Sequence, residues 1–259
     1  MAASATPTRA PRIPDDQLGQ LLALVDDADS VELKLTVPEA DQRSAVDALG
    51  MDPLEAQIRQ VFFFDTPELA LYEKGVVARA RRVQKRGDDS VVKLRPVVPS
   101  QLDESLRQSP NMVVEVDAMP GGFVCSASLK RSLGTTEVRE AARGERKHRK
   151  LFSKEQRAFF AEHAPEGIVL DELVMLGPIN VMKLKFSPAG YDRRLVAELW
   201  MYPDYTRILE LSTKCAPAET FDVAARTRAF LTDQGIDVTG EQQTKTRTAL
   251  KFFAKRRTK

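Results

Sequence analysis

Residues that commonly build metal centres and disulfide frameworks are scarce in this chain of 259 residues. It contains two cysteines and two histidines, and Cys125 and Cys215 are far from a Cys-x-x-Cys spacing. These residues are too few for a zinc site built from Cys and His ligands. The same scarcity argues against a fold that depends on disulfide bonds.

Long hydrophobic runs and an excess of charge of one sign are also absent. No uninterrupted apolar segment approaches the length that spans a membrane, and residues 1–14, M-A-A-S-A-T-P-T-R-A-P-R-I-P, lack the apolar core of a signal peptide. The 39 Lys and Arg residues are matched by 37 Asp and Glu residues, so a formal charge of +2 gives no global field for nucleic acid. We expect a soluble, cytoplasmic protein in which any anion site is local.

The chain length and its local composition predict the domain organisation. Residues 1–14 are rich in proline and small polar residues, which offer little to bury, so we expect an N-terminal tail over 1–28 that is partly disordered. A single domain is predicted over 29–259. Residues 121–167 are rich in Lys, Arg and Glu and contain the capping-box pattern S-K-E-Q, which predicts a helical insertion. Its basic segment 143–150 is interpreted as a solvated helix face rather than a nucleic-acid site.

Strand-like alternation recurs on both sides of this insertion. In residues 30–37, S-V-E-L-K-L-T-V, apolar side chains alternate with polar and charged ones, as expected for a strand with two different faces. Similar β-rich segments occupy residues 58–65, 75–83, 90–97, 112–117, 180–186, 193–200 and 206–214. Their short, turn-rich connections favour an antiparallel sheet. Helices are predicted over 38–49 and 217–235, and the pattern of the basic segment 250–259 leaves its structure open.

Charged residues stand at every second position of these segments, and two interpretations compete. In one, the charged face is the solvated side of an ordinary sheet. In the other, the sheet closes with this face inward, so that cations hold phosphate oxygens and carboxylates hold divalent ions. Pairs of like charge such as Arg79 with Arg81 favour the second interpretation, because they place like charges roughly 6–7 Å apart on one face.

Several motifs, in order, resemble those of the CYTH-type triphosphate tunnel proteins. The most specific is F-F-D-T-P-E-L-A-L-Y-E-K-G-V-V-A-R-A-R-R at residues 63–82. It is preceded by S-V-E-L-K-L and followed by V-V-K-L-R-P, V-E-V-D and I-L-E-L-S-T-K. The resemblance covers about residues 30–215. It implies an α+β fold: a closed antiparallel β-barrel with a charged interior, covered by helices, that binds triphosphate with Mg²⁺ or Mn²⁺.

The resemblance also implies roles for individual residues. Those similar to phosphate-binding positions are Lys34, Arg79, Arg81, Lys93, Arg95, Lys183, Lys185, Arg194 and Lys214. Those similar to metal-binding positions are Glu32, Glu115, Glu198 and Glu210, with Asp117 as an addition. The implied catalytic residues are Glu32, Lys34, Arg79 and Arg81. Trp200 shares the spacing of Glu198 and is expected either to stack on a substrate or to pack.

Two departures from the family pattern concern the metal. Ser30 stands where the first strand of the family usually carries its first Glu, and Ser212 replaces a second carboxylate of the last strand. A serine hydroxyl supplies no charge to hold a hard dication, so we expect weak metal binding. The predicted function is binding and metal-dependent hydrolysis of a triphosphate; the alternatives are a non-catalytic polyphosphate-binding module, a class IV-type adenylate cyclase and a structural domain without a ligand. The pattern does not choose a substrate or an oligomeric state.

Overall fold

The computed structural model describes residues 19, 22, 24–239, 242 and 244–257. The predicted disorder of residues 1–14 lies outside these. Within the predicted tail 1–28, Val25 and Ala28 are 3% and 8% exposed and belong to a hydrophobic core. The packed domain therefore includes the last residues of the segment that the sequence assigned to the tail. In the described part of the chain, no helix has the length and apolar character needed to cross a membrane.

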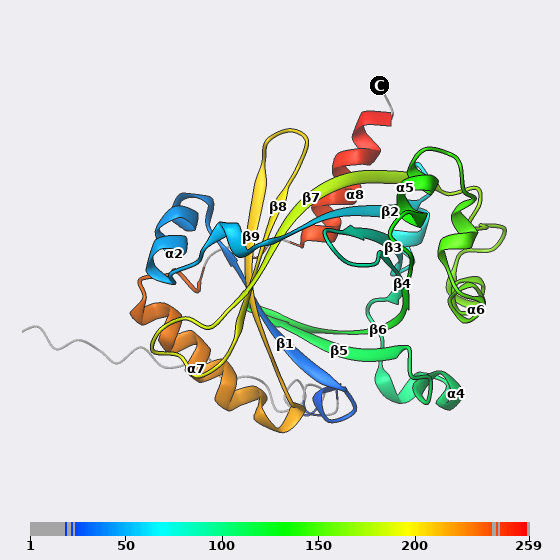
Figure 1. Cartoon of the computed structure of the whole chain (residues 1–259). Coiled ribbons are helices and arrows are strands. Elements are labelled where there is room, and N and C mark those ends of the chain that lie inside the picture. Colours follow the sequence, from blue (N-terminus) through cyan, green and yellow to red (C-terminus); the bar gives the residue numbers. More distant parts are fainter. Residues whose placement is uncertain (1–18, 20–21, 23, 240–241, 243, 258–259) are drawn as a thin grey trace, which may run out of the picture.

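The described residues contain nine strands that form a closed barrel (Figure 1). The strands are β1 (Ser30–Val37), β2 (Gln57–Asp65), β3 (Val76–Val83), β4 (Asp89–Leu94), β5 (Met112–Met119), β6 (Gly122–Ser132), β7 (Val174–Phe186), β8 (Leu195–Met201) and β9 (Arg207–Cys215). Around the barrel they follow the order β1-β5-β6-β4-β3-β2-β7-β8-β9, and β9 pairs with β1 to complete the ring. The predicted closed barrel is confirmed.

One neighbouring pair departs from the antiparallel arrangement that the sequence predicted. β1 and β5 run parallel, with Ser30 opposite Glu115 and Glu32 opposite Asp117. The strand number is the geometric reason, because an odd number of strands cannot alternate in direction all the way around a closed ring. The barrel is therefore mixed, with its parallel seam between β1 and β5.

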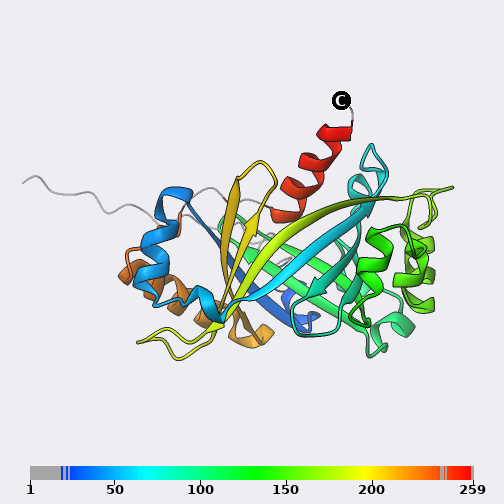
Figure 2. The ribbon, with the colours of Figure 1, turned by 45° about the horizontal axis from the view of Figure 1, so that its top comes forward.

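Most of the helices cover the outside of the barrel, whereas the last one, over residues 245–257, packs on inward-facing side chains. The elements are η1 (Glu39–Asp41), α2 (Gln42–Ala48), η2 (Pro53–Glu55), α3 (Ala70–Glu73), η3 (Pro99–Gln101), α4 (Glu104–Arg107), α5 (Glu137–Ala142), η4 (His148–Leu151), α6 (Lys154–His163), η5 (Pro217–Glu219), α7 (Thr220–Asp233) and α8 (Lys245–Arg257). Figures 1 and 2 show α2 and α7 on one side of the barrel and α5 and α6 on the other. The predicted helices over 38–49 and 217–235 are confirmed as η1 with α2 and η5 with α7.

The apolar side of the alternating strands faces these helices. Val31, Val92 and Val116 lie in one outer core together with Phe159 of α6. A second outer core joins β1, β7, β8 and β9 to Leu231 of α7. Because successive side chains of a strand point to opposite faces, the charged positions between these apolar ones point into the barrel. The inward interpretation of the charged face is thus the correct one.

The predicted helical insertion over 121–167 was partly wrong. Residues 122–132 form β6, which pairs with both β4 and β5. The sequence prediction missed it because Gly121 and Gly122 open the segment and its inward positions are serines and a lysine rather than an alternating charge pattern. The helical part of the insertion consists of α5, η4 and α6. The capping box at Ser153 and Gln156 is present as predicted.

The most specific sequence motif has a structural role at the end of β2. Asp65 is 1% exposed and accepts hydrogen bonds from the backbone N–H groups of Thr66 at 2.8 Å, Leu71 at 2.9 Å and Tyr72 at 3.0 Å. Burial raises its pKa. The carboxylate holds the turn that contains α3 against the barrel, and that turn leads directly into the Arg79 and Arg81 strand.

Candidate anion-binding site

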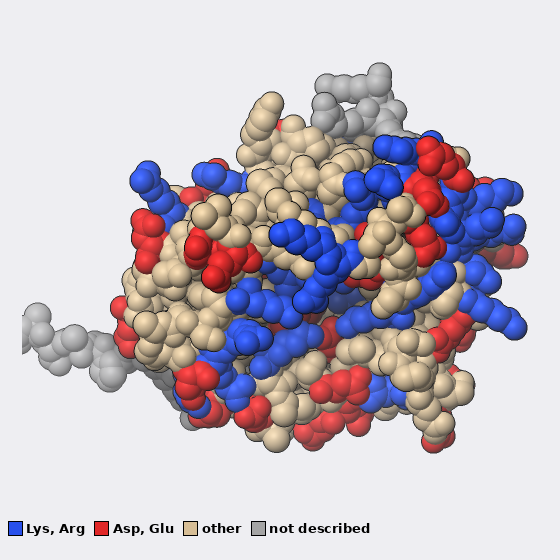
Figure 3. Space-filling model, in the orientation of Figure 1, with Lys and Arg blue, Asp and Glu red and all other residues tan. Residues whose placement is uncertain are grey.

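Pairings between neighbouring strands place one set of charged side chains on the inner surface of the barrel. The basic members are Lys34, Arg59, Arg79, Arg81, Lys93, Arg95, Lys130, Lys183 and Lys214. The acidic members are Glu32, Asp89, Glu115, Asp117, Glu198 and Glu210. Figure 3 shows Lys and Arg gathered across the middle of the face that Figure 1 views, where the strands surround the interior. The interior therefore carries more positive than negative charge.

Asp117 is the acidic centre of one part of this interior. Its side chain is 1% exposed, with Lys34 Nζ 2.7 Å from Oδ1 and Arg95 Nη1 3.0 Å from Oδ2. Lys93 Nζ is more distant, 3.8 Å from Oδ2. Burial by itself would raise the pKa of Asp117, but Lys34, Lys93 and Arg95 outweigh it and lower the pKa to about 2. The sequence analysis added Asp117 to the metal-binding positions. In the structure both of its carboxylate oxygens contact side-chain cations.

Glycine at position 75 allows the close strand approach that sets the position of Arg95. Gly75 has φ +75°, and its carbonyl accepts a hydrogen bond of 2.8 Å from the Arg95 N–H. A Cβ atom at this position would stand 2.5 Å from the Arg95 carbonyl oxygen. Only glycine fits both the left-handed backbone and the contact, so the motif residue Gly75 supports the site from outside it.

The positive charges of Arg79 and Lys93 have little nearby negative charge to balance them. Burial is the main cause that lowers the pKa of Arg79 to about 10, and the neighbouring Arg81 adds to it. Nε of Arg79 is buried without a hydrogen-bond partner, and no ion pair to Arg79 is found among the described residues. Burial likewise lowers the pKa of Lys93 to about 8, and its nearest acidic group is the 3.8 Å contact with Asp117. A buried donor without an acceptor is costly in free energy, which a bound anion would relieve.

The remaining arginines near Arg79 are differently paired. Arg81 makes a two-pronged ion pair with Asp89, with Nε 2.7 Å from Oδ1 and Nη2 2.8 Å from Oδ2. Arg59 of β2 donates to Gln57, at 3.0 and 2.6 Å, and burial lowers its pKa. Arg79 therefore lies near two further guanidinium groups, Arg59 and Arg81, and the nearby carboxylate of Asp89 is engaged by Arg81.

Glu198 and Glu210 form a second acidic centre. They are register partners on β8 and β9. Lys245 Nζ lies 2.6 Å from Oε2 of Glu198 and 2.7 Å from Oε1 of Glu210, while Lys183 Nζ lies 2.7 Å from Oε1 of Glu198. Trp200 Nε1 donates to Oε2 of Glu198 at 3.2 Å and the ring is 4% exposed, so Trp200 packs in the interior rather than at an open surface.

Glu32 and Glu115 lie in two further groups. Glu32 accepts a hydrogen bond of 3.1 Å from the Ser212 hydroxyl and lies 3.1 Å from Lys34 Nζ. Glu115 is paired with Lys214, and Lys130 Nζ is 3.9 Å away. Ser212 therefore faces the site, as its alignment with a carboxylate position of the family implied.

The structure divides the predicted metal ligands among these groups. Each of Glu32, Glu115, Glu198 and Glu210 contacts a lysine ammonium group. Within the described residues, no group of three His, Cys, Asp or Glu side chains is arranged to hold a metal ion. The donor set consequently does not fit a resident divalent ion in this arrangement.

Most of the predicted phosphate-binding residues are brought together in the interior, with two exceptions. Lys185, Arg194 and Lys214 are all exposed, but Lys214 pairs with Glu115, whereas no ion pair to Lys185 or Arg194 is found among the described residues. Both stand at the ends of strands, Lys185 near the end of β7 and Arg194 just before β8. They belong to the rim of the barrel rather than to its buried cation set.

Four charged interior residues were not predicted: Asp89, which pairs with Arg81, and three cations. Arg59 shares its inward face with Val61 and Phe63, so the strand shows no charge alternation that would reveal it. Lys130 lies on β6, in the segment predicted to be helical. Lys245 begins α8, ahead of the basic segment whose structure the sequence left open. A search for charged residues at alternating positions of a strand misses a charged residue, such as Arg59, whose neighbours on the same face are apolar.

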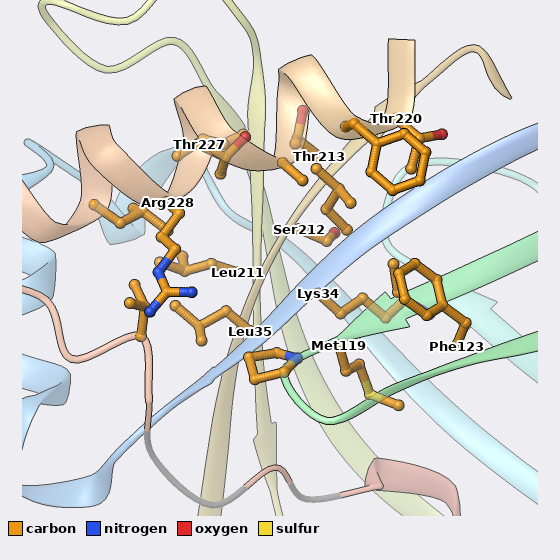
Figure 4. Close-up of a pocket in the computed structure, with 18 residues that line it drawn as sticks. Lys34, Leu35, Met119, Phe123, Leu211, Ser212, Thr213, Thr220, Thr227 and Arg228 are labelled. Carbon is orange, nitrogen blue, oxygen red and sulfur yellow. The ribbon is translucent and has the colours of Figure 1, made fainter. Parts of the chain in front are cut away.

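Two cavities lie near the interior set but differ in chemistry. A groove of about 680 Å³ runs beside the ends of β2 and β3 and is lined by Arg59, Arg82 and Arg86 among others. A second cavity of about 230 Å³, shown in Figure 4, lies between α7 and the outward-facing side chains of β1 and β9. Leucines and Phe221 dominate its lining, so it does not suit a phosphate chain.

Comparisons with known proteins confirm the fold. No protein-family model and no curated protein matches the chain. A provisionally assigned adenylyl cyclase from Hippeastrum with a dominant triphosphatase activity superposes with a TM-score of 0.59 at 18% identity, over 82% of this chain and 91% of the other. A provisionally assigned adenylate cyclase from Bacillus halodurans gives 0.58 at 13% identity, over 85% and 97%. The barrel predicted from the CYTH resemblance is thus shared with solved structures along nearly their whole length.

Proposed function

We propose that this protein binds a triphosphate group, or a longer inorganic polyphosphate, inside its barrel. The observation that carries the proposal is Arg79, a half-buried arginine whose buried Nε has no hydrogen-bond partner among the described residues and whose pKa is lowered to about 10, mainly by burial. Lys93, with a pKa of about 8, is in a similar environment. A polyphosphate would provide the acceptor oxygens and negative charge that both groups lack.

The geometry suits a chain of phosphates better than a single one. Arg79, Arg81 and Lys93 stand on the neighbouring strands β3 and β4, and Arg95 continues the line beyond β4. Inward side chains on one strand recur about every 6–7 Å, a separation that several linked phosphoryl groups can bridge. The exposed Lys185 and Arg194 would attract such a ligand at the rim.

Hydrolysis of the bound triphosphate is a second candidate function. It is favoured by the fold shared with the Hippeastrum protein, which has a dominant triphosphatase activity. In that reaction Arg79, Arg81 and Lys93 would neutralise the charge that develops on the transferred phosphoryl group while water attacks it. The Mg²⁺ or Mn²⁺ that the CYTH resemblance implies would add charge neutralisation when bound, but its predicted ligands are engaged by lysines.

The test combines ligand-induced stabilisation with phosphate release. Tripolyphosphate, ATP and thiamine triphosphate are each added to the purified protein with Mg²⁺, Mn²⁺ or EDTA, and melting temperature and products are measured. Tripolyphosphate should raise the melting temperature of the wild type and of Arg143→Ala, whose side chain is exposed at the end of α5, by clearly more than that of Arg79→Ala.

The outcomes separate the candidate functions. Phosphate release that Arg79→Ala abolishes would establish a triphosphatase, and cyclic AMP from ATP would establish a cyclase. Stabilisation without product would establish the binding module. A wild type that shows neither stabilisation nor product would contradict the proposal.

A further inference from the structure

Two carboxylates that face each other inside the barrel already have a cation between them. Glu198 and Glu210 are direct partners on β8 and β9, where like charges repel. The Lys245 ammonium group lies 2.6 Å from one and 2.7 Å from the other. Burial alone would lower the pKa of Lys245, but the two carboxylates outweigh it and raise the pKa, so the group stays charged.

Both carboxylate oxygens of Glu198 already contact a lysine ammonium group. Lys183 Nζ lies 2.7 Å from Oε1, and Oε2 accepts from both Lys245 at 2.6 Å and Trp200 at 3.2 Å. These ion pairs hold the pKa of Glu198 well below its usual range, against the opposing effect of burial. A metal ion that used Glu198 as a ligand would have to displace a lysine first.

Helix α8 fixes Lys245 in this position. Ala249 and Leu250 are 0% and 2% exposed and pack on inward-facing side chains of the barrel, Trp200 and Ile208 among them. The Tyr202 hydroxyl donates to the Lys245 carbonyl at 3.1 Å, and Lys245 Nζ lies 5.2 Å from the centre of the Trp200 ring. Figure 1 shows α8 beside β7, with which it is in contact.

We propose that Lys245 is the resident cation of this site, and that its ammonium group excludes a divalent ion from Glu198 and Glu210. A lysine anchored by a packed helix acts at a fixed, high effective concentration, whereas a dissolved ion must give up its hydration shell to enter. One ammonium group also satisfies two carboxylates without the full set of oxygen ligands that Mg²⁺ or Mn²⁺ requires. The inference deepens the proposed function, because it makes polyphosphate binding independent of divalent metal.

The test is a titration of the full chain with Mn²⁺, in which binding is measured by electron paramagnetic resonance and by calorimetry. Lys245→Met keeps the length of the side chain and removes its charge, so it should tighten Mn²⁺ binding by at least about tenfold over the wild type. Lys245→Arg keeps the charge and should stay as weak as the wild type. Lys251→Met, an exposed position on the same helix, should change nothing.

A further pair of variants keeps the inference testable if Lys245→Met fails to fold. If the wild type binds Mn²⁺ as tightly as Lys245→Met, or if Glu198→Gln or Glu210→Gln removes Mn²⁺ binding from the wild type, the inference is wrong. Tripolyphosphate should still raise the melting temperature of the wild type in EDTA. Failure of that stabilisation would contradict the proposed function, whereas the Mn²⁺ titration alone decides the role of Lys245.

Discussion

The Lys34 ammonium group lies 2.7 Å from Oδ1 of Asp117, across the seam where β1 and β5 run parallel. Arg95 approaches the other carboxylate oxygen at 3.0 Å. The carboxylate of Asp117 on β5 thus links β1 to the end of β4 and balances part of the positive charge of the interior. Stability and ligand binding are therefore opposed at Asp117, since the cations that it neutralises are the ones that a polyanion needs.

Replacement of Asp117 by Asn should destabilise the free protein and strengthen anion binding. Loss of one partner of a buried ion pair costs about 3–5 kcal/mol, because the other charges are left buried and uncompensated. Tripolyphosphate should then produce a larger increase in melting temperature in Asp117→Asn than in the wild type. Equal increases would show that Lys34, Lys93 and Arg95 do not contact the ligand.

The pKa of Asp117 gives this variant a pH signature. Because the pKa is lowered to about 2 in the folded state, the carboxylate contributes stability above its unfolded pKa and loses that contribution as the pH falls toward 2. The difference in free energy of unfolding between wild type and Asp117→Asn should shrink as the pH falls from about 5 to about 2. Urea titrations at several pH values measure it, and a difference that stays constant would exclude this linkage.

Arg79 and Arg81 should respond to the same substitution with opposite effects on stability. Arg79→Met removes a half-buried charge to which no ion pair is found among the described residues, so we expect the free protein to gain about 1–3 kcal/mol. Arg81→Met leaves the carboxylate of Asp89 without its two-pronged partner and should lower stability. Both variants should weaken tripolyphosphate binding by about one to two orders of magnitude, as expected for lost charge-assisted hydrogen bonds. A destabilised Arg79→Met with unchanged affinity would indicate a purely structural role.

Lys93 should make anion binding depend on pH. Burial lowers its pKa to about 8, so the free protein loses this charge as the pH rises through that value. A bound polyanion favours the protonated amine, so binding above that pH should weaken and be accompanied by proton uptake. Calorimetry in buffers of different ionisation enthalpy measures the uptake.

Matched variants isolate the contribution of Lys93 from the titration of tripolyphosphate itself. Lys93→Met should lack the extra proton uptake, whereas Lys185→Met, which changes an exposed lysine at the end of β7, should retain it. The same uptake in the wild type and in Lys93→Met would place the titration elsewhere.

Sequence patterns predicted which residues line the barrel better than which of these residues contact one another. Alternation in segments such as residues 30–37 identified which side chains share a face, because the strand period leaves two choices. Pairs of like charge favoured the charged face as the interior, and the family resemblance strengthened that choice. Alternation cannot show which strands become neighbours, so the parallel β1–β5 seam and the Asp117 ion pairs appear only in the folded structure.

The misplaced and missed residues have a common physical cause. Lys130 and Lys245 acquire their roles from pairing and packing between segments far apart in the sequence. Lys245 contacts carboxylates on β8 and β9 only because apolar residues of α8 pack on the barrel. The family resemblance named Glu198 and Glu210 as metal-binding positions, but it did not reveal the ammonium group that lies between them.

Asp65 provides a test of whether the F-D-T motif acts on the fold or on the ligand. Asp65→Ala leaves the buried N–H groups of Leu71 and Tyr72 without their acceptor, and we expect a loss of about 3 kcal/mol, since each unsatisfied donor costs about 1–3 kcal/mol. Asp52→Ala is a matched control, because Asp52 accepts a single backbone hydrogen bond of 2.8 Å from Leu54 in an exposed turn. That control should lose about 1 kcal/mol or less.

Chemical denaturation of the two variants measures the stability loss, and tripolyphosphate titration at a temperature where both are folded measures the effect on binding. A structural role for Asp65 requires a large loss of stability with an affinity close to that of the wild type, because the carboxylate contacts backbone donors rather than the interior cations. A stable Asp65→Ala with strongly weakened binding would instead assign Asp65 to the ligand. It would also mean that the turn around α3 is held by its apolar contacts, chiefly the fully buried Leu71, without the carboxylate.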